Sequence, residues 1–269
     1  MKTKKLRLGL LGKDVSNSDS EKIHRFILQE LGVACEYERF SVGAEDFDWA
    51  MRRLLGDFDG FNVTIPYKRD VMAYLSDFKG DALTYGAVNT VLNSTGMGYN
   101  TDGVGFLQMI RSSGIEFEGK RVLVLGGGGS GRSTAVALKN AGSDVYLYQR
   151  RKEKMLETCE ELGISPVNSP EMGGFDLLIN CTGVGMHDTE GVSPVTAKAF
   201  AGAKAAIDLI YVPKESEFLR IAKELGLKTL NGAAMLFFQA YYSDCIYLNM
   251  QPKAKQVEDL YEKYLKVYY

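Results

Sequence analysis

The stretch VLVLGGGGSGRSTAVAL, residues 122–138, decides the fold class. Four apolar residues run into four consecutive glycines, and a helical pattern follows directly. Gly126, Gly128 and Gly131 have the G-x-G-x-x-G spacing, which is informative only between a strand and a helix, as here. These glycines permit a tight turn, close approach of the backbone to a pyrophosphate, and close strand–helix packing. The stretch therefore predicts a Rossmann-type unit that holds a dinucleotide at a helix N-terminus.

Strand and helix patterns alternate on both sides of this stretch, which is typical of doubly wound α/β proteins. Upstream, strands are expected at residues 5–12, 35–42 and 60–66, helices at 20–31, 44–56, 67–77 and 102–114, and a hairpin over 87–100. Downstream, strands are expected at residues 120–126, 144–149, 176–183, 205–211 and 227–232, with helices at 130–142, 151–163 and 215–226. Two more helices are expected at residues 233–250 and 253–268.

The pattern predicts two α/β domains without a long linker. Residues 1–102 and 234–269 are expected to form the first, an N-terminal domain with a mostly parallel sheet. Residues 103–233 are expected to form the second, the Rossmann domain. The C-terminal helices would thus return to the first domain.

Composition excludes several classes of protein. The chain has 269 residues and a formal net charge of -2, so no basic surface indicates nucleic acid. Its N-terminal apolar run is too short for a signal peptide, and no run approaches the length of a membrane span. Four scattered cysteines indicate reduced thiols, and two distant histidines indicate no metal site. We expect a cytoplasmic monomer or homodimer with no nucleic-acid, membrane or metal partner.

The tip of the strand after the glycine turn indicates which dinucleotide binds. An NAD site has an acidic residue about 20 residues beyond the turn, which accepts from the ribose 2′-hydroxyl. Here the tip reads Gln149, Arg150 and Arg151, and Lys154 follows. Arginine binds a 2′-phosphate through charge-assisted hydrogen bonds, whereas a carboxylate would repel it. We therefore predict NADP(H); the alternative is a solvated basic helix start, which the helix dipole disfavours.

Lys68 and Asp102 are candidates for proton transfer. Each follows an apparent strand and precedes a helical pattern. Hydride transfer to a carbonyl needs a proton donor for the forming alkoxide, and the histidines are poor candidates. A lone lysine at a strand end is ordinarily solvated, and Asp102 could equally cap the next helix.

Seven segments form an ordered set along the chain. They are NVTIPYK (62–68), GAVNTV (86–91), GYNTDGVG (98–105), VLGGGGSG (124–131), INCTGVGM (179–186), DLIYVP (208–213) and NGAAMLFFQA (231–240). Their order and approximate spacing resemble those of shikimate dehydrogenases over nearly the whole chain. The resemblance implies an oxidoreductase of aromatic amino acid (chorismate) biosynthesis, which reversibly reduces 3-dehydroshikimate to shikimate with NADPH.

The resemblance also implies roles for individual residues. Lys68 would exchange a proton with the reacting oxygen, and Asp102 would pair with it and hold a substrate hydroxyl. The other substrate-binding residues would be Ser18, Ser20, Thr64, Asn89, Tyr211 and Gln239. The cofactor-binding residues would be Gly126, Gly128, Gly129, Ser130, Gly131, Gln149, Arg150, Arg151, Lys154, Thr182, Leu209, Gly232 and Met235.

The first loop, GKDVSNSDSEKIHR (residues 12–25), departs from the family pattern. Ser18 and Ser20 keep its Ser-x-Ser spacing, although Ser16 offers a second register. Asp14 and Glu21 replace its two prolines, and Asp19 lies between the serines. Acids directed at a substrate carboxylate would weaken its binding, whereas acids directed outward would have no effect.

Alternative functions stay open at this stage. The odd loop leaves quinate or another hydroxy ring acid as a possible substrate. A non-catalytic NADP-binding regulator is a second alternative, but it would need neither Lys68 nor Asp102. A folate-interconverting dehydrogenase is a third, and the NTDG and GAVNT stretches fit it poorly. Asn89 could instead be a turn residue, and Gln239 a satisfied core amide.

Overall fold

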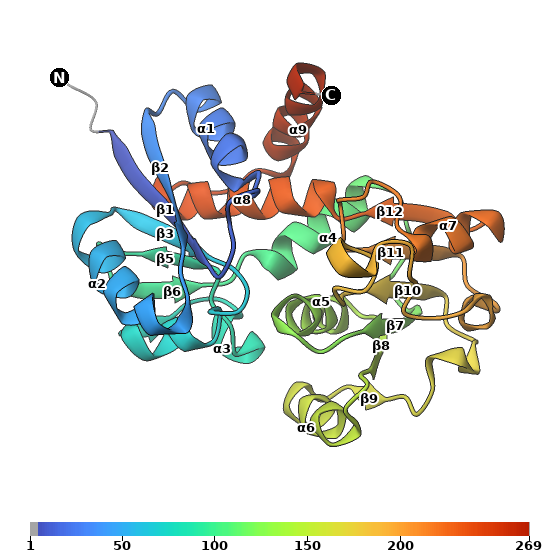
Figure 1. Cartoon of the computed structure of the whole chain (residues 1–269). Helices are drawn as coiled ribbons and strands as arrows, with labels where there is room; N and C mark the ends of the chain where they lie inside the picture. The colour runs from blue at the N-terminus through green and yellow to red at the C-terminus, as the bar shows by residue number, and fades with distance from the viewer. Residues whose placement is uncertain (1–4, 269) are drawn as a thin grey trace. The chain divides into compact units, whose positions relative to one another are not determined.

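The computed structural model describes residues 5–268 (Figure 1). The chain divides into two compact units. Unit 1 runs to Gly105 and resumes at Leu236, and unit 2 is Phe106–Met235. The chain passes between the units within helices α4 (Asp102–Ser112) and α8 (Ala233–Tyr247). These divisions lie a few residues from the boundaries predicted from the sequence.

Unit 1 is built on a six-stranded sheet in the order β2-β1-β3-β5-β6-β4. Its strands are β1 (Leu6–Gly12), β2 (Cys35–Ser41), β3 (Gly60–Val63), β4 (Asp77–Phe78), β5 (Thr90–Leu92) and β6 (Met97–Tyr99). Strands β2, β1 and β3 are parallel, and β5 runs antiparallel to β3 and β6 as the predicted hairpin. Its helices are α1 (Ser20–Glu30), α2 (Phe47–Asp57), α3 (Ala82–Tyr85) and α9 (Ala254–Tyr268), with short 3-10 turns at Ala44–Asp46 and Asp70–Tyr74.

The hydrophobic pattern explains how these elements pack. Leu8, Leu10 and Leu11 of β1 are all buried, as expected for a strand covered on both faces. Helix α1 buries Ile23 and Ile27 on one face, in the helical spacing of its apolar residues. The sheet is therefore covered by helices that present a single apolar stripe.

One element of unit 1 differs from the expectation. Residues 67–77 were expected to form a helix, and they form a 3-10 turn over Asp70–Tyr74 followed by β4. The end of the segment pairs with β6, where Asp77 lies opposite Met97. This ladder removes the residues that a longer helix would need, and a short helix has little stability of its own.

Unit 2 has the doubly wound topology that the glycine turn predicts. Its six strands are parallel in the order β12-β11-β10-β7-β8-β9. They are β7 (Arg121–Leu125), β8 (Asp144–Tyr148), β9 (Ser165–Pro166), β10 (Leu177–Asn180), β11 (Ala205–Asp208) and β12 (Lys228–Asn231). The helices are α5 (Gly129–Asn140), α6 (Lys152–Leu162) and α7 (Glu217–Glu224), with 3-10 turns at Pro170–Met172, His187–Thr189 and Ala197–Phe200. The strand order reverses between β7 and β10, the position at which such folds bind ligands.

Candidate active site and dinucleotide site

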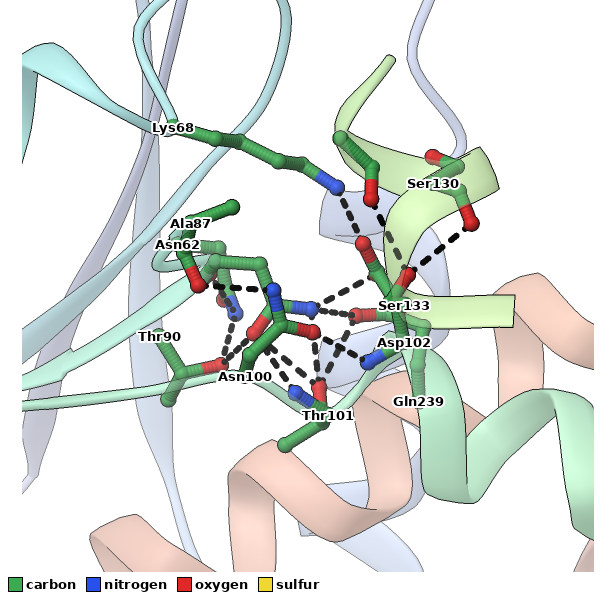
Figure 2. A network of polar contacts seen from close by, with 12 residues as sticks. Asn62, Lys68, Ala87, Thr90, Asn100, Thr101, Asp102, Ser130, Ser133 and Gln239 are labelled. Carbon is green, nitrogen blue, oxygen red and sulfur yellow. Dashed lines mark hydrogen bonds and ion pairs between the residues drawn. The ribbon is translucent and has the colours of Figure 1, made fainter. Parts of the chain in front are cut away.

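A lysine–carboxylate pair lies where the strands of unit 1 end. Because β1 and β3 are parallel neighbours, the chain leaves the sheet at one edge after both strands. Lys68 ends the loop after β3, and its carbonyl accepts from the backbone N–H of Val88 at 2.7 Å. Its Nζ donates to Asp102 Oδ2 at 2.5 Å, as Figure 2 shows. The side chains are only 12% and 6% exposed, and an ion pair buried to this degree is weak evidence of a purely stabilising role.

Two asparagines hold Asp102, one through its backbone and one through its carboxylate. Asn100 Oδ1 accepts from the backbone N–H of Asp102 at 2.9 Å, so this asparagine satisfies the first N–H group of helix α4. Asn89 Nδ2 donates to Asp102 Oδ1 at 2.8 Å. The two carboxylate oxygens are therefore engaged by Asn89 and Lys68 rather than by a helix N–H.

Asn89 is a hub of this site and is only 2% exposed. Its Oδ1 accepts from the backbone N–H of Thr101 and from Thr90 Oγ1, each at 2.9 Å. Its Nδ2 also lies 2.9 Å from Thr101 Oγ1 and 3.3 Å from Gln239 Oε1. These bonds favour a role in holding Asp102, and its predicted contact with a substrate hydroxyl stays a prediction. Thr90 and Thr101 were not predicted as site residues, although each directly follows an asparagine in the sequence.

Gln239 reaches this hub because helices α4 and α8 approach closely within unit 1. A Cβ on Gly105 would lie 2.8 Å from the backbone nitrogen of Gln239, so only glycine fits there. Gln239 also donates from Nε2 to the carbonyl of Leu236 at 2.9 Å. Thr64 follows β3 at the same sheet edge and is half-buried. The roles predicted for both residues stay predictions.

The acids of the first loop are engaged by their neighbours. Asp14 Oδ1 accepts from Ser16 Oγ at 2.7 Å, and Asp19 lies 3.7 Å from the ammonium of Lys22. Glu21 pairs with Arg25 at 3.0 Å and with Arg39 at 3.3 Å. Glu21 and Asp19 thus have cationic partners, whereas Asp14 is hydrogen-bonded to the neutral Ser16.

The serines of this loop are placed differently from one another. Ser18 Oγ donates to Ser20 Oγ at 3.0 Å at the start of helix α1, whereas Ser16 is exposed and bonded to Asp14. The geometry favours the Ser18/Ser20 register for binding an anion. A helix N-terminus also carries free N–H groups and a partial positive charge.

The glycine turn of unit 2 can hold a pyrophosphate. Gly126 has φ +98°, a conformation that favours glycine, and its N–H donates to the carbonyl of Tyr148 at 2.9 Å. A Cβ on Gly131 would lie 2.0 Å from the carbonyl oxygen of Gly126, so the helix can approach the strand only without a side chain. A Cβ on Gly128 would meet nothing within 4 Å. Helix α5 begins at Gly129 and Ser130, so its first N–H groups are available to an anion.

Alanine substitutions should separate packing from ligand approach in this turn. Gly131→Ala is expected to destabilise the free protein by about 1–3 kcal/mol, because its methyl group would overlap backbone. Gly128→Ala is expected to leave the melting temperature unchanged, since its methyl group would enter open space, and to weaken NADP binding. Thermal unfolding without nucleotide and NADP titration would check both. Equal destabilisation by the two substitutions would contradict this reading of the turn.

Basic side chains follow β8, as predicted. Arg150, Arg151 and Lys154 are all exposed around the start of helix α6. Gln149 packs against the glycine turn: a Cβ on Gly127 would lie 2.2 Å from its Oε1. This Oε1 is buried without a hydrogen-bond partner in the described structure. An unmatched acceptor and free cations beside an open turn fit a dinucleotide with a 2′-phosphate.

The residues predicted for the nicotinamide end lie after β10 and β11 and before or within α8. Thr182 Oγ1 donates to Asn180 Oδ1 at 2.6 Å, and a Cβ on Gly126 would lie 2.9 Å from Thr182 Cγ2. A Cβ on Gly232 would lie 2.1 Å from the carbonyl oxygen of Leu209, so these segments are in close contact. Met235, the last residue of this set, is buried. Tyr211, which was predicted to bind the substrate carboxylate instead, is half-buried in unit 2.

Asp208 anchors this end of the sheet. It is fully buried and accepts from Asn180 Nδ2 at 3.0 Å, the Ile210 N–H at 3.0 Å and Ser216 Oγ at 2.5 Å. Burial raises its pKa, and these hydrogen bonds oppose that rise. Asp208 thereby fixes Asn180, which in turn orients Thr182.

Comparison with known proteins decides the family. The model of the "Shikimate dehydrogenase substrate binding domain" matches residues 10–91. A shikimate dehydrogenase (NADP(+)) of Thermus thermophilus is 36% identical over 97% of this chain and 100% of its own length. The chain belongs to the shikimate dehydrogenase family.

Solved structures of shikimate dehydrogenases share the whole architecture. The Thermus thermophilus enzyme in complex with NADP(H) and shikimate has a TM-score of 0.87 at 35% identity, covering 96% of this chain and 99% of that one. Shikimate dehydrogenase 1 of Peptoclostridium difficile also has a TM-score of 0.87, at 31% identity, covering 96% and 97%. The predicted fold class, two mainly parallel α/β units with C-terminal helices in the first, is confirmed.

Residues 5–268 lack two features of other protein classes, a membrane-spanning helix and a cluster of metal ligands. No helix there is long and apolar enough to cross a membrane. Within the same residues, no three side chains of His, Cys, Asp or Glu gather to hold a metal ion.

Proposed function

We propose that this protein is an NADP-dependent shikimate dehydrogenase, which reversibly reduces 3-dehydroshikimate to shikimate in chorismate and aromatic amino acid biosynthesis. The observation that carries the proposal is the buried Lys68–Asp102 pair, oriented by Asn89 at a strand edge. Membership of a family whose relatives bear this name supports it. A non-catalytic regulator has no use for such a pair, and the NADP-binding features would be common to both functions.

The mechanism needs one proton donor on this chain. NADPH supplies the hydride for the reacting carbonyl carbon when it is bound. Lys68, as an ammonium, gives a proton to the carbonyl oxygen as this oxygen gains negative charge, and it recovers a proton from the shikimate hydroxyl in the reverse direction. Asp102 holds the Lys68 amine in one position through its Oδ2, and Asn89 fixes that carboxylate through its Oδ1. Positioning of this kind lowers the entropic part of the barrier.

Neutral polar groups would orient the hydroxylated ring. Ser18 and Ser20 would bind the substrate carboxylate at the start of helix α1. Thr64 and Gln239 would bind ring hydroxyls, as would Asp102 and Asn89. The ion pairs of Asp19 and Glu21 reduce the repulsion that the acids of the first loop would exert on an anion.

We assign the substrate to unit 1 and NADP to unit 2, and we propose a cytoplasmic monomer or homodimer. The glycine turn would bind the pyrophosphate, and Arg150, Arg151 and Lys154 the 2′-phosphate. Gln149 would contact the adenosine end.

Turnover of ring acids tests the proposal directly. We expect the nicotinamide absorbance band to rise with shikimate and NADP, and to rise much less with NAD. Quinate is the matched comparison, since it is a ring acid of the same class. Faster turnover of quinate than of shikimate would mean that quinate is the substrate. NADPH binding without turnover of either acid would indicate a non-catalytic regulator.

A further inference from the structure

A second layer of polar side chains lies beneath the Lys68–Asp102 pair in unit 1. Asn62 of β3 is only 5% exposed and makes hydrogen bonds in two directions. Its Nδ2 donates to the backbone carbonyl of Asn89 at 3.2 Å, and lies 3.3 Å from the hydroxyls of Thr90 and Ser243. Its Oδ1 accepts from the hydroxyl of Tyr37 at 3.1 Å. Figure 2 shows Asn62 and Thr90 below Lys68 and to the left of Asp102.

Backbone groups fix the direction of these bonds. A carbonyl oxygen only accepts, so the Asn62 amide must turn its Nδ2 to Asn89 and its Oδ1 to Tyr37. A backbone N–H only donates, so that of Thr101 likewise fixes Asn89 Oδ1 and leaves Nδ2 to face Asp102. Thr90 connects the two amides, because its hydroxyl accepts from Asn62 and donates to Asn89. The Tyr37 hydroxyl is then the donor that satisfies Asn62 Oδ1.

Tyr37 is itself held rigidly in the core. Its ring stacks on His24 with centroids 4.9 Å apart and planes 18° apart. His24 Nδ1 lies 2.7 Å from Asp244 Oδ1 on helix α8, and both side chains are fully buried. Burial, and secondarily the nearby Asp244, raise the pKa of Tyr37 well above its ordinary value, so the phenol keeps the proton that it donates.

We propose that Tyr37 and Asn62 are positioning residues that act through Asn89 on Asp102. Without the Tyr37 hydroxyl, Asn62 Oδ1 would be buried without a donor. A flipped amide would be no better, because it would place two acceptors, Asn62 Oδ1 and the Asn89 carbonyl, against each other. The Asn89 carbonyl and the Thr90 hydroxyl would lose the donor that Asn62 supplies, so the Asn89 side chain, and with it Asp102, would be held less firmly. This inference rests on the proposed function, since it concerns the pair that carries it.

Tyr37→Phe tests the inference with a minimal change. The phenyl ring keeps its stacking on His24 and loses only the donor. We expect kcat with shikimate to fall about tenfold, because small displacements of catalytic groups are costly. The KM for NADP should stay within about twofold, because the residues assigned to NADP lie in unit 2. A purely structural role would lower the melting temperature without this division between kcat and KM.

Tyr247→Phe is the matched control. Tyr247 is also buried close to His24, with ring centroids 6.5 Å apart, and its hydroxyl has no hydrogen-bond partner among the described residues. This variant should keep wild-type kcat within about twofold. Equal kcat values for the Tyr37→Phe variant and the wild type would overturn the inference, as would equal losses in both phenylalanine variants.

A second measurement does not depend on turnover. Hydrogen exchange of the Asn89 side-chain amide, observed by ¹⁵N NMR and assigned by its absence in Asn89→Asp, reports directly on the orientation of this amide. We expect exchange about tenfold faster in Tyr37→Phe and unchanged in Tyr247→Phe. Unchanged exchange in Tyr37→Phe would overturn the inference even for an active enzyme. Faster exchange in a protein without shikimate turnover would support the polar chain and refute the proposed function instead.

Discussion

Lys68→Ala is expected to lower kcat with shikimate by at least about 100-fold, the usual scale for loss of a group that transfers a proton. The substitution removes the only cation paired with Asp102 among the described residues, and it leaves that largely buried carboxylate uncompensated. NADP affinity should change little, because the residues assigned to NADP lie in unit 2. Steady-state kinetics with shikimate and a fluorescence titration with NADPH would measure both quantities.

Two further variants separate proton transfer from charge. Lys68→Arg keeps a cation that can pair with Asp102, but a guanidinium does not release its proton at working pH. We expect it to stay nearly as inactive as Lys68→Ala. Lys5→Ala removes the same charge at the opposite edge of the sheet, before β1, where Lys5 pairs with Glu36 on the surface. It should keep wild-type kcat, since such pairs contribute little. Wild-type rates in Lys68→Ala would refute the role of Lys68.

Periodicity in the sequence predicts most of the fold because the parallel strands are buried and long enough to give a recognisable apolar pattern. β7 and β8 follow apolar runs, and the glycine turn fixes where helix α5 begins. It missed the two strands of two residues and the four-residue helix α3. β4 and β9 exist only because a partner strand lies beside them, so nothing in their own residues reveals them.

The site could be predicted only in part, for a similar reason. Lys68 and Asp102 stand in segments that resemble a family, so their pairing was expected. The hydrogen bonds that orient them join residues far apart in the chain: Thr90 and Ser243 bond across 153 positions. Which of them meet depends on the register of β3 with β5 and on the close approach of α4 to α8, and no local pattern encodes either.

The first loop shows a second limit of prediction from sequence. Its acids suggested a site that repels an anion, because a sequence gives residue types without the directions of their side chains. In the structure, Glu21 reaches Arg25 on its own helix and Arg39 on β2. Only the fold places Arg39 beside this loop.

Arg150→Ala is expected to weaken NADP binding about 10- to 150-fold and NAD binding less than about threefold. A charge-assisted hydrogen bond contributes on the order of 1.5–3 kcal/mol, which corresponds to such a factor. Arg150 is exposed after β8, so it would gain a strong partner only from a ligand that carries a 2′-phosphate. Titrating each nucleotide into the wild type and the variant, at one salt concentration, gives the four dissociation constants.

Lys204→Ala is the matched control for this experiment. It removes one exposed positive charge from unit 2 at the amino end of β11, whereas Arg150 follows the carboxyl end of β8. Both variants lower the net charge equally, so a general electrostatic effect would weaken NADP binding in both. A specific 2′-phosphate contact weakens it in Arg150→Ala alone.

The ratio of NADP to NAD affinity decides the assignment more firmly than either affinity. Damage to the glycine turn or to helix α5 would weaken both nucleotides equally, since they share the pyrophosphate, and would cancel in the ratio. Loss of a contact with the 2′-phosphate weakens the binding of NADP alone, so it changes the ratio. Arg151→Ala extends the test, because Arg151 lies at the N-cap position of α6 and competes for the same role. An unchanged ratio in both arginine variants would mean that the phosphate is bound elsewhere.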